Sequence, residues 1–295
     1  MELVLSDIDD DTFRAAVLAP LGEHNQAALG RSFPQGTVAI VLRDAQGAVE
    51  GGMWAGYWWE WLKLELAFLP EHRRGRGLGA RMLATLEHVA LARGCRGVWM
   101  SSFSVQAPDF YKKLGYREIG RLEGRPLLGE ADVFLARDDG LGQRPATLAV
   151  TDAPDRSIYT AILHRLRDFT DTRLGPDRMR AIGDATTGPT RFCTLSVLLR
   201  DDAGAILGGL WGYTGRGWLF IELLGLPKAA RGAGLGTKIM TMAMDEARLR
   251  GCVGVWLDTF SFQARPFYEK LGFSVFGQID GYPTGHSRYF LAKRL

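Results

Sequence analysis

The chain has 295 residues with a formal net charge of +3, and 46% of its residues are apolar and 23% charged. This length suits two domains with ordinary packed cores, and the small charge, without a dense Lys/Arg stripe, argues against a nucleic-acid partner. No apolar run reaches transmembrane length, the acidic start MELVLSDIDDD lacks the pattern of a signal peptide, and three cysteines form no disulfide framework. We therefore expect a cytoplasmic protein without a membrane partner.

An internal repeat organises the chain. Residues 43–116 and 200–273 align without a gap at a constant offset of 157, with 34 identities over 74 positions. A repeat of this length is a duplicated domain rather than a solenoid unit. The polar segment RDDGLGQRPA (137–146) separates the copies. We predict an N-terminal domain over 1–140 and a C-terminal domain over 146–295, with a linker at about 138–146.

Hydrophobic period and turn residues predict the elements of the second copy in chain order. They are a strand over 147–152, a helix over 157–173, strands over 190–201, 205–214 and 218–226, a helix over about 234–250, a strand over 253–260, a short helix over 264–271 and closing strands over 273–279 and 287–295. Ser157 is the expected N-cap of the first helix, and Gly251 and Gly272 follow the later ones. The pattern β-α-α-β-β-β-α-β-α-β-β predicts an α/β (α+β) fold, a mixed and mostly antiparallel sheet flanked by helices, present twice.

A glycine-arginine loop opens the long helix of each copy, as RRGRGLG (73–79) and ARGAGLG (230–236). The first fits the dinucleotide pattern G-x-G-x-x-A, but three antiparallel-looking strands precede it instead of a βαβ unit, and Thr237 breaks the pattern in the second copy. Glycines let the backbone approach a ligand, and the free N–H groups of a helix start favour an anion. Arg74 and Arg231 add a charge beside it. The loops therefore predict two phosphate or pyrophosphate cradles.

The order of strand, LP…RGxGLG loop, long helix, strand and FYxKLGF segment resembles the GNAT superfamily of N-acetyltransferases. The family's acetyl-CoA loop, R/Q-x-x-G-x-G/A, is matched at 74–79 and again at 231–236. The resemblance covers essentially the whole chain, as a tandem pair of GNAT folds. It implies acetyl transfer from acetyl-CoA to an amine, without a metal and without a covalent enzyme intermediate. The alternative for each loop is a glycine-rich helix start that holds no ligand.

The coenzyme-binding residues that the loops and the resemblance imply lie in both copies. In the first copy they are Leu66, Phe68, Arg73, Arg74, Gly75, Arg76, Gly77, Leu78, Gly79, Ala80 and Gln106. In the second they are Leu224, Leu226, Arg231, Gly232, Ala233, Gly234, Leu235, Gly236, Thr237 and Gln263. The two glutamines fall where many family members have an asparagine, and we expect them to orient the loop backbone near the coenzyme.

Tyrosine and glutamate are the first catalytic candidates. Attack of an amine on a thioester requires loss of the amine's proton and stabilisation of the leaving thiolate. The resemblance implies that Tyr111 and Tyr268 are general acids for the thiolate, with core packing as the alternative. Glu65 and Glu222 lie in the strand before each loop, where an acid is costly unless it lines a pocket or is paired. They are the candidate bases, with a structural role as the alternative.

Other polar and aromatic residues leave two interpretations each. Asp258, which is Ser101 in the first copy, is a candidate to bind or deprotonate a cationic amine, or a turn residue. His286 is a proton relay or structural. The aromatic stretch MWAGYWWEW (53–61) lines an acceptor pocket or packs. Cys95 and Cys252 share one repeat position, which indicates burial rather than nucleophilic function.

The favoured function is an acetyl-CoA-dependent N-acetyltransferase in which the C-terminal domain is the surer catalyst, because it combines Glu222, Asp258 and Tyr268. The alternative is an acetyl-CoA-binding regulatory or structural protein in which one or both domains are non-catalytic. The acceptor is a small-molecule amine or a protein amine. A duplicated chain can pack its halves as an internal pseudo-dimer, so we expect a monomer of that kind or a homodimer.

Overall fold

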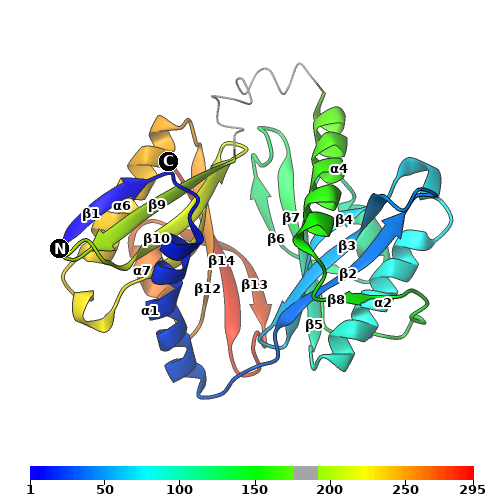
Figure 1. Ribbon diagram of the computed structural model, residues 1–295, viewed down its shortest axis with the longest axis horizontal. Coiled ribbons are helices and arrows are strands. Elements are labelled where there is room, and N and C mark those ends of the chain that lie inside the picture. Colours follow the sequence, from blue (N-terminus) through cyan, green and yellow to red (C-terminus); the bar gives the residue numbers. More distant parts are fainter. Residues whose placement is uncertain (176–191) are drawn as a thin grey trace.

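The computed structural model describes residues 1–175 and 192–295. Within these ranges, 14 strands form a single mixed sheet in which most neighbours are antiparallel and the pairs β4–β5 and β11–β12 are parallel. Helices flank the strands, as Figure 1 shows. The predicted α/β class, with a mostly antiparallel mixed sheet and helices in each half, is confirmed.

The elements follow each other in the same order in both halves, apart from the place of the 176–191 segment. In the first half they are β1 (Glu2–Ser6), α1 (Asp11–Leu29), β2 (Gly36–Arg43), β3 (Val49–Trp58), β4 (Trp61–Phe68), the 3₁₀ turn Glu71–Arg73, α2 (Leu78–Ala92), β5 (Gly97–Phe103), α3 (Pro108–Lys113), β6 (Arg117–Glu123) and β7 (Ala131–Arg137). In the second half they are β8 (Thr151–Asp152), α4 (Arg156–Leu174), β9 (Cys193–Arg200), β10 (Ile206–Gly215), β11 (Trp218–Gly225), the 3₁₀ turn Lys228–Ala230, α6 (Leu235–Leu249), β12 (Gly254–Phe260), α7 (Arg265–Lys270), β13 (Ser274–Asp280) and β14 (Ser287–Arg294).

These bounds agree with the sequence except at three places. The strand predicted over 147–152 forms only at its end, as β8 (Thr151–Asp152). The carboxylate of Asp155, not Ser157, caps α4, because it accepts a hydrogen bond from the Ser157 N–H over 2.8 Å. The second helix of the predicted pattern falls before the strand over 190–201, and residues 176–191 lie outside the described ones.

The sheet has an internal pseudo-twofold relation. Its strand order is β1-β9-β10-β11-β12-β14-β13-β6-β7-β5-β4-β3-β2-β8, which pairs each strand of one half with its repeat equivalent at the same distance from the centre. The two halves meet where β13 adjoins β6, at Gly277 and Gly120. Added Cβ atoms at Gly120 would lie 2.5 Å from a backbone oxygen of the other strand, so this close approach requires glycine.

The first strand and helix of each repeat are exchanged between the halves. β1 pairs with β9 from Glu2↔Arg200 to Ser6↔Ser196, and β8 pairs with β2 at Val38↔Asp152 and Ala39↔Thr151. In Figure 1, α1 lies with the strands of the second half and α4 with those of the first. The predicted domain boundary between residues 140 and 146 stays a prediction about where the sequence repeat divides. In the folded chain, the first strand and helix of each repeat pack on the other repeat.

Hydrophobic contacts hold the exchanged helices on the sheet. Val17 of α1 packs with Trp211 and Leu223, and Ile162 of α4 packs with Trp54 and Leu66. Both Val17 and Ile162 are fully buried, and burial of such side chains contributes about 1.5–3 kcal/mol each. Helices α2 and α6 cover the opposite face with their own cores. Each half therefore depends on a helix that the other half supplies.

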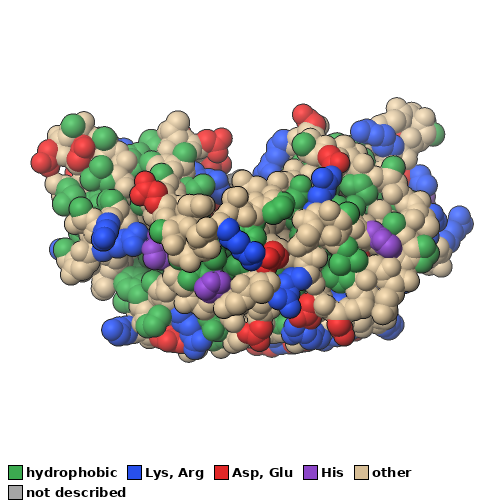
Figure 2. All heavy atoms as spheres, turned by 90° about the horizontal axis from the view of Figure 1, so that it is seen from below, with side chains coloured by type: hydrophobic (Ala, Val, Ile, Leu, Met, Phe, Trp, Pro, Cys, Tyr) green, Lys and Arg blue, Asp and Glu red, His purple; other side chains and the backbone are tan. Residues whose placement is uncertain are grey.

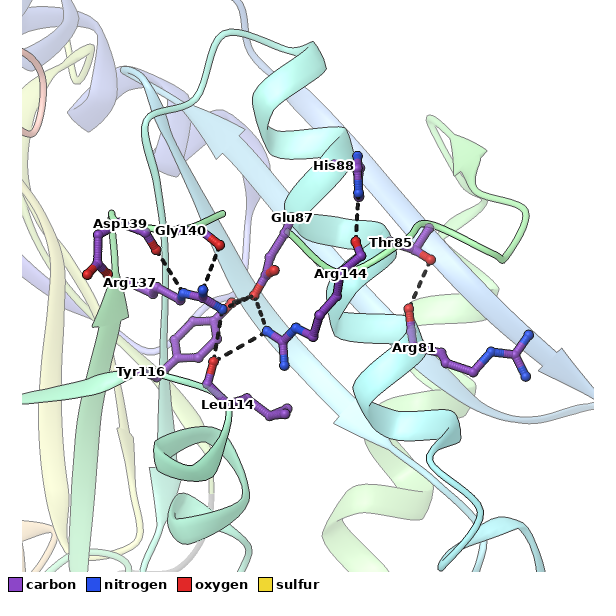
Figure 3. A network of polar contacts seen from close by, with 10 residues as sticks. All are labelled: Arg81, Thr85, Glu87, His88, Leu114, Tyr116, Arg137, Asp139, Gly140 and Arg144. Carbon is purple, nitrogen blue, oxygen red and sulfur yellow. Dashed lines mark hydrogen bonds and ion pairs between the residues drawn. The ribbon is translucent and has the colours of Figure 1, made fainter. Parts of the chain in front are cut away.

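The predicted linker is docked on the first half. Figure 3 shows buried Glu87 of α2 accepting hydrogen bonds from Arg144 at 2.9 Å, Arg137 at 3.3 Å and Tyr116 at 3.2 Å. Buried charges are costly unless they are paired, so this cluster ties the segment to α2. The next residues lead along α2, where Thr147 accepts from Arg81. The chain then reaches the edge of β2, and β8 pairs with that edge.

Aromatic side chains fill the boundary between the halves. Trp61 donates from its indole to the Gly281 carbonyl at 2.8 Å, and its repeat equivalent Trp218 donates to Gly124 at 3.1 Å. The ring of Trp61 also stacks on Tyr282 at 5.3 Å between centroids. Of the stretch 53–61, Met53 lines a cleft, whereas the tryptophans pack in the interior or at this boundary. For the tryptophans of this stretch, the structure therefore supports packing rather than the lining of an acceptor pocket.

The surface carries mixed charge. Figure 2, seen from below, shows Lys and Arg side chains interspersed with Asp and Glu across both lobes of that face. None of the helices within the described ranges is both long and apolar enough to span a bilayer.

Candidate active site

The two glycine loops have the same backbone conformation. Gly75 and Gly77 have φ of +78° and +74°, and Gly232 and Gly234 have +84° and +75°. Side chains rarely adopt these angles, and a Cβ at any of the four would meet nothing within 4 Å. The loops therefore present bare backbone to open space. Gly79 and Gly236 differ, because a Cβ there would approach Phe110 and Phe267 at 3.2 and 3.3 Å.

Each loop leaves the start of its helix without a side-chain cap. Gly77 and Gly234 are the N-caps of α2 and α6, and at neither helix start does a capping side chain accept a hydrogen bond from the first N–H groups. The first N–H groups of a helix have no intrahelical partner, and the helix dipole favours an anion there. The residues present therefore fit the pyrophosphate of acetyl-CoA in both halves.

The loop arginines brace the backbone. Arg74 donates through Nε to the Leu69 carbonyl at 2.8 Å, and Arg231 does the same to Leu226 at 2.9 Å. Their remaining guanidinium N–H groups stay available to an anion. The guanidinium of Arg74 also stacks on Phe169 of the exchanged helix α4, 4.6 Å from the ring centroid.

Each loop borders a cleft between the strands. The first cleft, of about 530 Å³, is lined by the loop glycines, Leu64, Glu65, Phe68, Met100, Ser101, Gln106, Tyr111 and three residues of α4, namely Leu166, Phe169 and Arg173. The second, of about 460 Å³, is lined by its loop glycines, Leu224, Leu226, Thr237, Thr259, Gln263, Tyr268 and two residues of α1, Leu21 and His24. The helix residues could not be assigned from sequence, because they come from the opposite half.

Strand geometry explains where the clefts open. The parallel pairing of β4 with β5 ends at Leu64↔Met100, and that of β11 with β12 ends at Ile221↔Leu257. Immediately afterwards each strand has a β-bulge: Trp54 faces Leu66 and Ala55 faces Leu64, which makes Glu65 the extra residue. The equivalent bulge makes Glu222 the extra residue of β11. A bulge re-aims its side chain, and both candidate bases lie where neighbouring strands part.

The two glutamates have different surroundings. Glu65 lines the first cleft and has no ion pair or hydrogen bond with another described residue. Glu222 forms an ion pair with Arg14 of the exchanged helix α1 and does not line the second cleft. Both oxygens of Glu65 are thus without a described partner, whereas Arg14 engages Oε1 of Glu222.

The two tyrosines have equivalent places. Tyr111 and Tyr268 line the first and second clefts, and each is 8% exposed. Burial raises the pKa of Tyr111 to about 12, and burial, with Asp258 adding to it, raises that of Tyr268 further. Neither hydroxyl has a hydrogen-bond partner among the described residues. Both phenols are therefore protonated donors that face a cleft.

Asp258 is engaged by Arg288. The guanidinium donates from Nε at 2.9 Å and approaches through Nη2 at 2.8 Å, and it also donates to the Tyr282 hydroxyl at 3.0 Å. Asp258 does not line the second cleft. His286 lies 3.1 Å from the Ser261 hydroxyl and also outside the cleft walls.

The glutamines connect the loops before α3 and α7 to the exchanged helices. Gln106 accepts from the Phe103 N–H at 3.1 Å and donates to Thr170 of α4 at 2.8 Å. Gln263 accepts from the Phe260 N–H at 3.0 Å and donates to Asn25 of α1 at 2.8 Å. Both thus hold loop backbone beside a cleft.

Several residues assigned to the coenzyme lie elsewhere. Leu66 packs against α4, Arg73 pairs with Glu50 at 2.5 Å, and Arg76 and Ala233 are exposed outside the cleft walls. Cys95 and Cys252 are buried, as expected, and burial raises their pKa values to about 12 and about 11.

Comparison with known proteins finds the same family in both halves. A model described as "Acetyltransferase (GNAT) family" matches residues 159–273, and one described as "Acetyltransferase (GNAT) domain" matches residues 34–118. An acetyltransferase of Agrobacterium fabrum is 42% identical over 118 residues, which are 40% of this chain and 86% of the relative. The blasticidin-S acetyltransferase of Streptomyces morookaense is 39% identical over 97 residues, 32% of this chain and 70% of that protein. A crystal structure of an acetyltransferase from Bacillus cereus is 27% identical, with a TM-score of 0.40, and covers 48% of this chain and 94% of its own.

Proposed function

Because the chain belongs to the GNAT family of acetyltransferases and depends on acetyl-CoA, we propose that its N-terminal half transfers the acetyl group to a small-molecule amine. One observation carries this assignment: a single cleft joins the first glycine loop, Tyr111 and a glutamate, Glu65, that has no described partner. The second cleft does not reach its glutamate.

The loop of the first half holds the coenzyme by its backbone. The N–H groups at Gly75, Gly77 and the start of α2 bind the pyrophosphate, and Arg74 adds charge beside it. When bound, acetyl-CoA supplies an activated thioester. Phe169, by stacking on Arg74, keeps the arginine against the loop.

Two side chains move protons during the transfer. Glu65 accepts the proton that the attacking amine loses, directly or through water, as the bond from nitrogen to the acetyl carbon forms. Tyr111 donates its phenolic proton to the sulfur as the carbon–sulfur bond breaks, and its high pKa keeps that proton available at neutral pH. The two groups lie at the same cleft, which allows both transfers around one substrate.

This proposal places catalysis in the other half from the one favoured by sequence. Asp258 and Glu222 made the C-terminal half the richer candidate, but both carboxylates form ion pairs with arginines. A guanidinium that engages a carboxylate takes up lone pairs that could otherwise accept a proton from an amine. The second half keeps its loop and Tyr268, which support coenzyme binding there.

Matched substitutions in the two halves test the assignment. We expect Glu65→Gln and Tyr111→Phe to lower amine-dependent release of CoA by about a hundredfold, within the range typical of a lost general acid or base. We expect Glu222→Gln and Tyr268→Phe to retain most of the activity. Loss of activity in the second pair and retention in the first would transfer catalysis to the C-terminal half.

The acceptor class rests on the relatives. The name of one of them specifies blasticidin S, a small molecule, so that compound leads a panel of small primary amines, with a lysine-containing peptide as the protein-amine control. The assay measures thiol release from acetyl-CoA. Binding of acetyl-CoA without thiol release from any amine would favour the alternative of a non-catalytic coenzyme-binding protein.

A further inference from the structure

The exchanged helices place different residues at equivalent positions of the two sites. Asp10 and Asp155 cap α1 and α4, each accepting from the N–H two residues later. Counted from these caps, Arg14 and Tyr159 are both at the fourth position, and the fully buried Val17 and Ile162 are both at the seventh. The two helices are therefore in the same register on the sheet, and Arg14 corresponds to Tyr159.

Of these two residues, Arg14 contacts a bulge glutamate directly. Arg14 forms an ion pair with Glu222, and their side chains are 36% and 26% exposed. Tyr159 packs edge-on against Trp54 at 5.4 Å between centroids. Burial, chiefly, and the negative charge of Glu65 raise the pKa of Tyr159, so its hydroxyl stays neutral. The helix position that supplies a cation to Glu222 therefore carries a neutral phenol in the first half, and no hydrogen bond or ion pair joins Glu65 to another described residue.

A second difference comes from the sheet itself. The repeat equivalent of Tyr213 is Gly56, and a Cβ at Gly56 would lie 3.2 Å from the Glu65 carboxylate. In the second half Tyr213 fills this space, where its hydroxyl accepts from the Trp211 indole at 3.1 Å. A Cβ at Gly56 would also lie 3.0 Å from the Trp58 ring, so Trp58 and the Glu65 carboxylate border in the first half the position that the Tyr213 side chain takes in the second.

We propose that Arg14, supplied by the first half, closes the acceptor side of the second site, and that Tyr159, supplied by the second half, keeps Glu65 free to act as the base. This inference rests on the proposed function. Arg14 and Tyr159 are positioning residues, since they act through the glutamates. The second site then binds acetyl-CoA or CoA without transferring an acetyl group.

Carboxylate labelling tests the proposal without an assay of turnover. A water-soluble carbodiimide with glycine ethyl ester modifies free carboxylates, and peptide mass spectrometry locates the product. We expect Glu65 to be labelled several times faster than Glu222 in the full chain. Arg14→Met should expose Glu222 to labelling, and Tyr159→Arg should protect Glu65. Equal labelling of both glutamates in the unmodified chain would overturn the proposal.

Turnover gives the complementary test. Tyr159→Arg should lower kcat at least about tenfold by pairing Glu65, while KM for acetyl-CoA changes less than about twofold. Tyr159→Phe, which retains the ring, should keep most of kcat, and Thr160→Arg places the same cation one residue away on the exposed side of α4 as a matched control. Thermal unfolding and acetyl-CoA titration identify any variant that does not fold. Full activity in a folded Tyr159→Arg variant would contradict the proposal.

A gain of activity in the second site is the third test. In a Glu65→Gln background, the pair Arg14→Tyr and Tyr213→Gly copies the first site into the second, and we expect turnover at least about tenfold above that background. No gain in a folded triple variant that still binds acetyl-CoA counts against the inference. If Glu65→Gln itself keeps full turnover, the proposed function fails instead, so the two failures are distinguishable.

Discussion

Gln263 and Asn25 lie 238 positions apart in the chain, yet the side-chain amide of Gln263 donates to the Asn25 side chain over 2.8 Å. Gln106 and Thr170 make the equivalent contact in the other site. Each glutamine also accepts from loop backbone, at Phe260 or Phe103. The loop beside each coenzyme cleft is therefore held by a helix from the opposite half of the chain.

Removal of one such contact should affect one site only. Asn25→Ala leaves the Gln263 amide without its acceptor, which costs about 1–3 kcal/mol where the group stays shielded from water. We expect weaker coenzyme binding at the second site and unchanged binding at the first, measured by calorimetric titration with acetyl-CoA. Thr170→Ala is the matched control and should show the reverse pattern. Equal weakening of both sites by Asn25→Ala would indicate a global loss of structure.

A side chain in the glycine loop should abolish coenzyme binding locally. Gly77 has φ of +74°, so Gly77→Ala strains the backbone by about 1–2 kcal/mol and crowds the N–H groups at the start of α2. We expect KM for acetyl-CoA to rise at least about tenfold. Gly234→Ala, with the same geometry at the second loop, should remove one binding event in a titration while turnover persists. Loss of turnover in both variants would show that the sites are coupled.

The pH dependence of kcat should show no decrease at alkaline pH caused by ionisation of Tyr111. Burial raises the pKa of this phenol from 10.0 to about 12, so it remains a proton donor up to about pH 11. The folded state holds this proton more tightly than the unfolded state, so the corresponding stability is fully present below pH 10 and is lost as the pH rises through 12. Tyr111→Phe should remove this loss of stability and lower kcat about a hundredfold. The measurements are kcat and thermal unfolding from pH 6 to 11. A phenolic limb near pH 9 that disappears in Tyr111→Phe would contradict this assignment.

Thiol labelling should distinguish the three cysteines. Cys95 and Cys252 are buried, and their raised pKa values keep them as thiols, which react slowly. Cys193 is partly exposed. A chromogenic disulfide at pH 8 should therefore titrate one thiol rapidly in the folded chain and three in denaturant. Cys193→Ser should remove the rapid phase, and rapid reaction of a second thiol would show that one of the buried strand starts opens readily.

Much of each coenzyme cradle could be predicted from short stretches of sequence. The glycines at 75, 77, 232 and 234 have positive φ, as a loop that presents bare backbone requires, and both long helices begin within a residue of the expected place. The burial of Cys95 and Cys252 followed from their shared repeat position. These properties depend on residues that are neighbours in the chain.

The acceptor side could not be predicted in this way. Glu222 and Asp258 were attractive candidates because the sequence predicts two carboxylates at the second site, but neither lines the cleft, and Arg14 and Arg288 reach them across 208 and 30 positions. The cap of α4 was misplaced by two residues because an aspartate and a serine both favour that position.

The repeat, the two loops and the family follow from the sequence by itself, because a duplicated motif and a positive φ are local properties. Only the tertiary structure decided which half completes which site. The edges of β2 and β9 offer equivalent backbone groups to an incoming strand, so local sequence does not choose between them. The choice comes from long-range contacts, in which Arg144 docks the connecting segment on Glu87 and leads β8 and α4 to the opposite half. Through the same exchange Arg14 pairs with Glu222, and Tyr159 takes the corresponding helix position in the first half, against Trp54.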